Sequence, residues 1–177
     1  MYIIDGKSEI TYTGRTAVVI GKFDGIHKGH QKLIREAVSD PSLKSVVFSF
    51  TMDSEKYLKD SGRILSREER RLKFESLGVD YLVEYELNEQ TMKTEPEDFA
   101  REILRTRLHC KRLICGPDLS FGYKGRGNIE LLRNLSSELD IEVTVIDKLQ
   151  YKGEDISSTR IRAAIKEGRR TEAKEML

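Results

Sequence analysis

Short apolar runs alternate with segments of helical periodicity along almost the whole chain. The apolar runs predict buried strands at Thr16–Ile20, Ser45–Phe50, Tyr81–Tyr85, Arg112–Cys115 and Glu142–Ile146. Between them, apolar residues recur at three- and four-residue spacing, which predicts helices near Gly29–Val38, Arg67–Leu77, Glu95–Leu108 and Ile129–Leu139. Such alternation is typical of βαβ units, so we expect an α/β fold with an open parallel sheet of about five strands, flanked by helices.

Two of the predicted helices start at a capping box, in which a hydroxyl and a carboxylate three residues later satisfy free backbone N–H groups reciprocally. The first box is Ser66-Arg67-Glu68-Glu69 and the second is Thr94-Glu95-Pro96-Glu97. We therefore expect these helices to begin directly after Ser66 and Thr94.

The composition is typical of one soluble globular domain over residues 1–177, with 38% hydrophobic and 34% charged residues. No apolar stretch approaches the length of a membrane span, and the first residues lack the pattern of a secretory signal, so we expect a cytoplasmic protein with no membrane role. The net charge of +1 gives no general attraction to nucleic acid. Cys110 and Cys115 lack the neighbouring ligands of a zinc site, so we interpret both as reduced thiols.

The most informative motif lies between the first predicted strand and the helix that follows it. It reads Gly21-Lys22-Phe23-Asp24-Gly25-Ile26-His27-Lys28-Gly29-His30. Open α/β sheets bind ligands beyond the carboxyl ends of their strands, and a helix N-terminus offers free N–H groups and a positive dipole end. The three glycines let the backbone come close to a bound group. Neither a dinucleotide fingerprint nor a Walker loop is present, so we expect His27 and His30 to mark a phosphate site of another kind.

A second cluster, Asp155-Ile156-Ser157-Ser158-Thr159-Arg160-Ile161-Arg162, leads into a helical stretch. Ser157 or Ser158 can cap that helix. Capping does not explain the arginines, because a cation near a helix N-terminus opposes the helix dipole. An anion between the two positive centres would explain them, so this cluster is a candidate anion site.

A third stretch, Cys115-Gly116-Pro117-Asp118-Leu119-Ser120-Phe121-Gly122, follows the fourth predicted strand and is expected to open on the same edge of the sheet. Asp118 either forms a turn with its own backbone or holds a hydroxyl or amino group of a ligand. His109, at the end of a predicted helix, is expected to be structural.

Taken in order, these three motifs resemble the prokaryotic FAD synthetases, the FMN adenylyltransferase module of the bifunctional riboflavin kinase/FAD synthetase family. The resemblance covers nearly the whole chain, and the segment Ile156-Ser157-Ser158-Thr159-Arg160-Ile161-Arg162 is its most specific part. It implies a Rossmann-like sheet of the His-x-Gly-His nucleotidylyltransferase type, and transfer of AMP from ATP to FMN with Mg²⁺, giving FAD and pyrophosphate. The chain ends near the point where the family's riboflavin kinase module begins, so we expect no kinase domain.

The resemblance also implies roles for single residues. His27 and His30 would bind ATP phosphates and steady the charge on the transferred phosphate, and Arg162 would stabilise the transition state. The other residues implied for ATP or its phosphates are Gly21, Phe23, Asp24, Gly29, Ser157, Ser158, Thr159 and Arg160. Asp118, Phe121 and Gly122 would border the nucleotide or the flavin. The resemblance leaves the ligands of the Mg²⁺ open.

The chain departs from the family on the flavin side. After the second predicted strand the family usually carries a Pro-His-Pro loop, where this chain reads Thr51-Met52-Asp53-Ser54, and Leu119 and Ser120 stand where Phe and Arg are common. Two alternatives therefore stay open beside FMN adenylyltransferase. One is a nucleotidylyltransferase that acts on another phosphorylated acceptor, and the other is a catalytically weak nucleotide- or flavin-binding module with a regulatory role.

Overall fold

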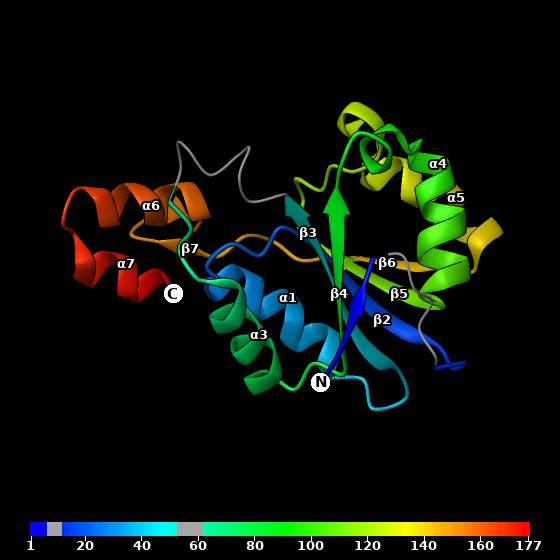
Figure 1. The fold of residues 1–177 in the computed structure, drawn as a ribbon, viewed down its shortest axis with the longest axis horizontal. Helices are drawn as coiled ribbons and strands as arrows, with labels where there is room; N and C mark the ends of the chain where they lie inside the picture. Colours follow the sequence, from blue (N-terminus) through cyan, green and yellow to red (C-terminus); the bar gives the residue numbers. More distant parts are fainter. Residues whose placement is uncertain (7–11, 53–61) are drawn as a thin grey trace.

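The computed structural model describes residues 1–6, 12–52 and 62–177 (Figure 1). Its centre is a six-stranded sheet in which every described pair of neighbours is parallel, in the order β1-β4-β3-β2-β5-β6. Its strands are β1 (Tyr2–Asp5), β2 (Thr16–Gly21), β3 (Lys44–Met52), β4 (Tyr81–Leu87), β5 (Cys110–Cys115) and β6 (Glu142–Val145). The α/β fold with an open parallel sheet is therefore confirmed.

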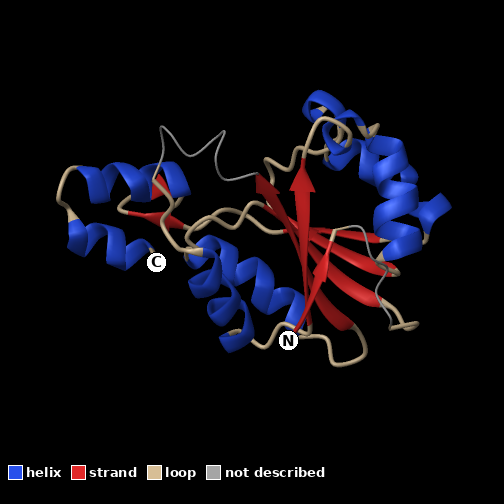
Figure 2. Cartoon of the chain, in the orientation of Figure 1, coloured by secondary structure: helices blue, strands red, loops and turns tan. Residues whose placement is uncertain are grey.

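Helices cover both faces of this sheet, and two further helices lie beyond one end of it (Figure 2). They are α1 (Lys28–Val38), α3 (Arg67–Ser76), α4 (Pro96–Asp98), η2 (Phe99–Arg107), α5 (Ile129–Leu139), α6 (Ser158–Lys166) and α7 (Arg170–Met176), with short turns η1 (Thr91–Lys93) and η3 (Tyr123–Gly125). A small antiparallel hairpin, β7 (Gln150–Tyr151) and β8 (Glu154–Asp155), precedes α6. Among the described residues, none of the helices is both long enough and apolar enough to span a membrane.

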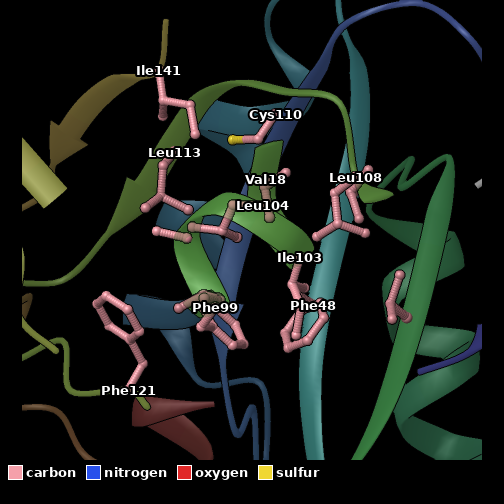
Figure 3. Packing of buried hydrophobic residues seen from close by; sticks show 14 of the residues in the cluster. Val18, Phe48, Phe99, Ile103, Leu104, Leu108, Cys110, Leu113, Phe121 and Ile141 are labelled. Atoms are coloured by element: carbon pink, nitrogen blue, oxygen red, sulfur yellow. The ribbon is translucent and has the colours of Figure 1, made fainter. Parts of the chain in front are cut away.

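Strand β2 is apolar without interruption because both of its faces are covered. Val18 and Ile20 belong to the core cluster under η2 and α5, where Figure 3 shows Val18 and Phe48 close to Phe99, Ile103 and Leu104. Ala17 and Val19 belong to the cluster on the other face, under α1 and α3. Burial on both faces fixes the direction of β2, and with it the point at which the following turn leaves the sheet.

All five predicted strands are present, and the sheet has one strand more than expected. Strand β1 lies at the edge, paired with β4 from Tyr2 opposite Tyr81 to Asp5 opposite Glu84. Tyr2 and Ile3 remain 71% and 45% exposed. The apolar run at this strand, Met1-Tyr2-Ile3-Ile4, has only four residues at the very start of the chain, so the pattern alone does not identify it as a strand.

One of the two predicted capping boxes is confirmed. The Ser66 hydroxyl accepts from the Glu69 N–H at 3.2 Å, and the Glu69 carboxylate accepts from the Ser66 N–H at 2.7 Å. The box at Thr94 is wrong, because the helix begins one residue later, with Glu95 at the N-cap and no side-chain cap. This register places Pro96 at the first helical position, where its fixed φ and missing N–H are best tolerated. From Phe99 to Arg107 the helix is wound more loosely, as a π-helix.

The C-terminal helices form a separate small core that is attached to α1. Ile156, Ile161, Ala164, Ala173 and Met176 pack together between α6, α7 and the segment before them. The attachment comes from two side chains of α1: Gln31 Nε2 donates to the Leu177 carbonyl at 2.6 Å, and Lys28 Nζ donates to the carbonyl of Glu175. In Figure 1 the C-terminus accordingly lies beside α1.

The turn after β2 occupies the place where open α/β sheets most often bind ligands. From β2, the chain places β3 and β4 on one side and β5 and β6 on the other. The strand order thus reverses between β2 and β5, and ligands bind outside the carboxyl ends of strands at such a switch point.

Candidate functional site

The turn between β2 and α1 is fixed by two buried side chains in an unusual backbone conformation. Phe23 and Ile26 have positive φ values of 50° and 42°, and both are fully buried. Positive φ costs on the order of 1–3 kcal/mol for residues of this kind, so the conformation persists only because packing imposes it. Asp24 lies between the two and is therefore held in a defined place.

The two histidines form a stacked pair at the start of α1. His27 is the N-cap residue, and its Nδ1 accepts from the backbone N–H of His30 at 3.3 Å. That bond leaves the ring proton of neutral His27 on Nε2. The two rings lie 3.7 Å apart between centroids with an interplanar angle of 18°, and Phe23 packs edge-on against His30 at 5.1 Å.

The glycines of the turn make room for the protein's own side chains, and that they also let the backbone approach a bound group stays a prediction. A Cβ on Gly29 would lie 3.2 Å from two atoms of the His27 ring, and one on Gly21 would lie 3.2 Å from the Phe23 ring. Gly25 has φ +82°, and a Cβ there would meet Ile64 at 2.9 Å. The spaces are filled because the side chains of His27, Phe23 and Ile64 pack directly onto the backbone of the turn.

Burial keeps both imidazoles neutral at neutral pH. It lowers the pKa of His27 to about 4, against a smaller opposite effect of the Asp24 charge. It lowers the pKa of His30 to about 3, helped by the nearby charges of His27 and Arg70. Within the described part of the chain, His30 Nδ1 is buried without a hydrogen-bond partner. A buried polar atom without a partner is uncommon and is consistent with a position where a ligand completes the site.

Helix α6 reaches the same turn from the other end of the sequence. The Ser158 hydroxyl donates to the Asp24 carbonyl at 2.7 Å, and the Arg162 guanidinium pairs with the Asp24 carboxylate at 2.5 Å. Arg162 also donates to the Thr159 hydroxyl at 3.4 Å. The structure thus brings Ser158, Thr159 and Arg162 to the turn of the histidines. The anion beside Arg162 is supplied here by Asp24.

Two residues of the same motif have structural contacts instead. Ser157 is the N-cap of α6, and its hydroxyl accepts from the Arg160 N–H at 3.2 Å. Arg160 donates to the carbonyls of Tyr151 and Glu154, each at 2.9 Å, and lies 3.4 Å from the Glu172 carboxylate. Arg160 therefore joins the β7–β8 hairpin to α7, and we do not include it in the site.

The third predicted stretch does not converge with the first two through its described contacts. Asp118 is 71% exposed in its side chain and pairs with Lys148 at 2.9 Å. Phe121 is buried in the core, with its ring 5.3 Å from that of Phe99. Gly122 has φ +70°, and a Cβ on it would lie 2.7 Å from the Pro96 Cα. Phe121 and Gly122 thus have packing and backbone roles, and Asp118 links its loop to the segment before the hairpin.

Sequence reasoning missed Arg70, on α3. One of its terminal nitrogens, Nη2, donates to the Lys22 carbonyl at 3.3 Å and to the Ser49 hydroxyl, so the guanidinium lies against the turn that follows β2. A sequence signal was available, because Arg70 is four residues before the fully buried Phe74 and so shares the inward face of its helix. The run of charged residues around it hid that signal.

Other features of the structure add no further group to this site. In residues 1–6, 12–52 and 62–177, no cluster of three or more His, Cys, Asp or Glu side chains is arranged to hold a metal ion. A hollow of about 470 Å³ lies beside the start of α4, lined by Glu95, Arg126 and Asn128 among others, and it contains none of the candidate residues. Of the family's flavin-side loop region, Thr51 and Met52 end β3, and Asp53 and Ser54 lie outside the described residues.

Comparison with known proteins gives a consistent family match. The family model described as FAD synthetase matches residues 9–160. An FAD synthetase of Listeria monocytogenes is 34% identical over 92% of this chain and 69% of its own length. A bifunctional riboflavin kinase/FMN adenylyltransferase of Buchnera aphidicola is 33% identical over 92% of this chain, which spans 54% of that relative.

Solved structures agree on the fold. A protein of Streptococcus pneumoniae, described as a macrolide-efflux protein, superimposes with a TM-score of 0.83 at 29% identity, over 99% of this chain and 60% of its own. Pantoate-beta-alanine ligase of Francisella tularensis superimposes with a TM-score of 0.58 at 16% identity, over 90% of this chain and 72% of its own. At that identity the second likeness concerns the fold alone.

Proposed function

The chain belongs to the FAD synthetase family, and from that premise we propose that it is an FMN adenylyltransferase, which transfers AMP from ATP to the phosphate of FMN and releases pyrophosphate. One observation carries the proposal. Ser158 and Arg162 of α6 are bonded to Asp24, in the turn that leads to the histidine pair, although they are more than 130 residues away in sequence. A transfer site for a triphosphate needs such a convergence of donors from several elements.

The cationic and hydroxyl side chains of α6 are suited to bind the pyrophosphate that leaves in the reaction. We assign Ser158, Thr159 and Arg162 to the β- and γ-phosphates of ATP. Arg162 offers a planar fork of N–H donors that matches phosphate oxygens, and in the structure Asp24 holds that fork in place. When ATP binds, its phosphates compete with Asp24 for the same donors. The negative charge that grows on the departing pyrophosphate is then stabilised by groups already in position.

The histidine pair is suited to the phosphate that is transferred. Because Nδ1 of His27 accepts a hydrogen bond, Nε2–H is the donor available to an α-phosphate oxygen. Both rings are neutral before substrate binds, since burial lowers their pKa values to about 4 and about 3. A bound phosphate raises the pKa of a neighbouring imidazole, so substrate binding favours proton uptake by the pair. The FMN phosphate is itself the nucleophile, and no covalent enzyme intermediate is required.

Magnesium enters this proposal as a companion of ATP. Mg²⁺ is commonly held by one or two carboxylates together with substrate phosphates, and it keeps several waters. The described residues offer no three-ligand cluster, and the Asp24 carboxylate is engaged by Arg162. When bound, the ion would neutralise phosphate charge, with the ATP oxygens as its main ligands. Dependence on ATP supports the cytoplasm as the compartment of the reaction.

The test is product formation by the purified chain. Incubation with ATP, Mg²⁺ and FMN is expected to give FAD and pyrophosphate in equal amounts. Pyrophosphate formed only with a different phosphorylated acceptor would instead identify a related nucleotidylyltransferase. Tight binding of ATP or FMN without any product would indicate a binding module, and either result would contradict the proposal.

A further inference from the structure

Helix α3 carries two arginines whose charges are compensated within the protein. Arg67 and Arg71 both pair with Glu84 of β4, at 2.5 and 2.6 Å, and the Glu84 side chain is only 6% exposed. Burial alone would raise the pKa of Glu84, but the hydrogen bonds from the two arginines outweigh it and lower the pKa to about 2. Glu84 is therefore ionised, and its charge is shared between these two partners.

Arg70, between them in sequence, makes no direct ion pair with a described carboxylate. Its described hydrogen bonds go from Nη2 to a carbonyl and a hydroxyl, and in the part of the chain that the structure describes its Nε is buried with no acceptor. Among the described residues no carboxylate lies within ion-pair distance of it, and Asp24 is paired with Arg162. Burial lowers the pKa of Arg70, against smaller opposite effects of the Glu84 and Asp24 charges, and the charges of Arg63 and Arg67 lower it further. A half-buried cation with a free donor is costly unless an anion completes it.

The position of Arg70 indicates where such an anion would bind. Arg70 contacts the carbonyl of Lys22, two residues before Asp24, and lies close enough to His30 to depress its pKa. His30 Nδ1 is the other buried atom of this region that has no partner in the described residues. Two incomplete polar groups next to the same turn are best explained by one anionic ligand beside the histidine pair.

We propose that Arg70 binds the phosphate monoester of the acceptor FMN and aligns it for attack on the α-phosphorus of ATP. The inference rests on the proposed function and adds a residue to it. In phosphoryl-type transfer the entering and leaving oxygens lie roughly in line, on opposite sides of the phosphorus. The leaving phosphates are assigned to α6, through Arg162 and its neighbours. Arg70 reaches the turn from α3, and its guanidinium donates to the Ser49 hydroxyl of β3, so it approaches from an element other than α6 and is available to the entering phosphate.

The test compares two flavins that differ only in the phosphate. FMN and riboflavin affinities are measured by quenching of flavin fluorescence in the wild type, in Arg70→Gln and in Arg67→Gln, a matched control from the same helix. Arg70→Gln is expected to weaken FMN binding by about 10- to 100-fold, the effect of one lost charge-assisted hydrogen bond. Riboflavin binding should change by less than about 3-fold on the same argument, because it lacks the phosphate. Arg67→Gln should leave the ratio of the two affinities unchanged.

Several results would overturn the inference. Equal weakening of FMN and riboflavin would give Arg70 a structural role, and a loss confined to ATP affinity would assign it to the other substrate. A wild type that does not prefer FMN to riboflavin would also exclude it. If Arg70→Gln does not fold, Arg70→Met decides, because it keeps the apolar stem of the side chain but loses the charge, and an unchanged preference for FMN in that variant would refute the role.

Because these affinities need no turnover, they decide the role of Arg70 separately from the proposed function. A wild type that makes no FAD would contradict the adenylyltransferase. The comparison of FMN and riboflavin affinities would still show whether Arg70 binds the flavin phosphate.

Discussion

Arg160 and Arg162 lie two residues apart on α6, and the structure predicts opposite consequences for their replacement by glutamine. Arg160→Gln should lower the stability of the protein and leave the activity of the folded molecules nearly unchanged. Arg162→Gln should do the reverse. The reason is that Arg160 donates to the backbone of the β7–β8 hairpin, whereas Arg162 lies against Asp24 beside the histidine pair.

The magnitudes follow from burial and contacts. The Arg160 side chain is 16% exposed and makes two hydrogen bonds of 2.9 Å to carbonyls, so its loss should cost about 2–4 kcal/mol of unfolding free energy. The Arg162–Asp24 pair is 31% and 27% exposed, and solvent screening limits its contribution to about 1 kcal/mol or less. Loss of a donor to developing phosphate charge should reduce kcat by about 10²-fold or more.

Urea unfolding followed by circular dichroism gives the first quantity, and FAD formation per folded molecule gives the second. We expect Arg160→Gln to lose stability but keep its activity, and Arg162→Gln to lose activity but keep its stability. Equal activity losses in the two variants would refute the separation of roles. An Arg162→Gln enzyme with wild-type kcat would remove Arg162 from the site.

Three further predictions concern the histidine pair and the ion-pair cluster of α3. Below pH 6.5 the unfolded chain binds a proton at His30 that the folded protein does not bind, so acidification lowers the free energy of unfolding. The contribution is fully present above pH 6.5 and falls by about 2 kcal/mol per buried histidine down to pH 5. In urea titrations His30→Asn should lose less stability on acidification than the wild type, and an equal loss would contradict the burial argument. Glu84→Gln should lower the unfolding free energy by about 2–4 kcal/mol, because it leaves two arginines unpaired, and a value near zero would show that solvent already screens them. Gly29→Ala places a methyl group 3.2 Å from the His27 ring, which must then shift. We expect kcat to fall by about 10-fold at unchanged stability. Full activity would show that the position of the ring is not critical.

The sequence predicted the sheet well because burial on both faces leaves a plain pattern. Strands β2 to β6 appear as apolar runs, and the box at Ser66 appears as a hydroxyl followed by a carboxylate three residues later. Edge strand β1 has only a short apolar run at the start of the chain, and two of its residues, Tyr2 and Ile3, remain exposed, so it was not predicted. At Thr94 the capping pattern competed with the preference of Pro96 for the first helical position, and proline determined the register.

The site was only partly predictable, because a sequence motif identifies residues but does not determine the direction in which their side chains point. The two arginines of the segment Ser157-Ser158-Thr159-Arg160-Ile161-Arg162 cannot be told apart by charge, yet only Arg162 pairs with Asp24. Phe121 follows a strand at the correct edge, but its ring is taken up by the core. Arg70 belongs to no motif, and its role depends on Glu84 being occupied by its neighbours, a contact between a helix and a strand that only the fold defines.

The central claim is that the histidine pair acts on the phosphate transferred from ATP to FMN, and one measurement tests it most directly. FAD formation and FMN affinity are determined for the wild type, His30→Ala and His109→Asn; His109 lies outside the site at φ +51°, a conformation that asparagine tolerates. We predict that His30→Ala lowers kcat by about 10²-fold or more while FMN affinity changes little, and that His109→Asn retains both. Equal losses of turnover and FMN affinity in His30→Ala, or a wild-type kcat, would contradict the account.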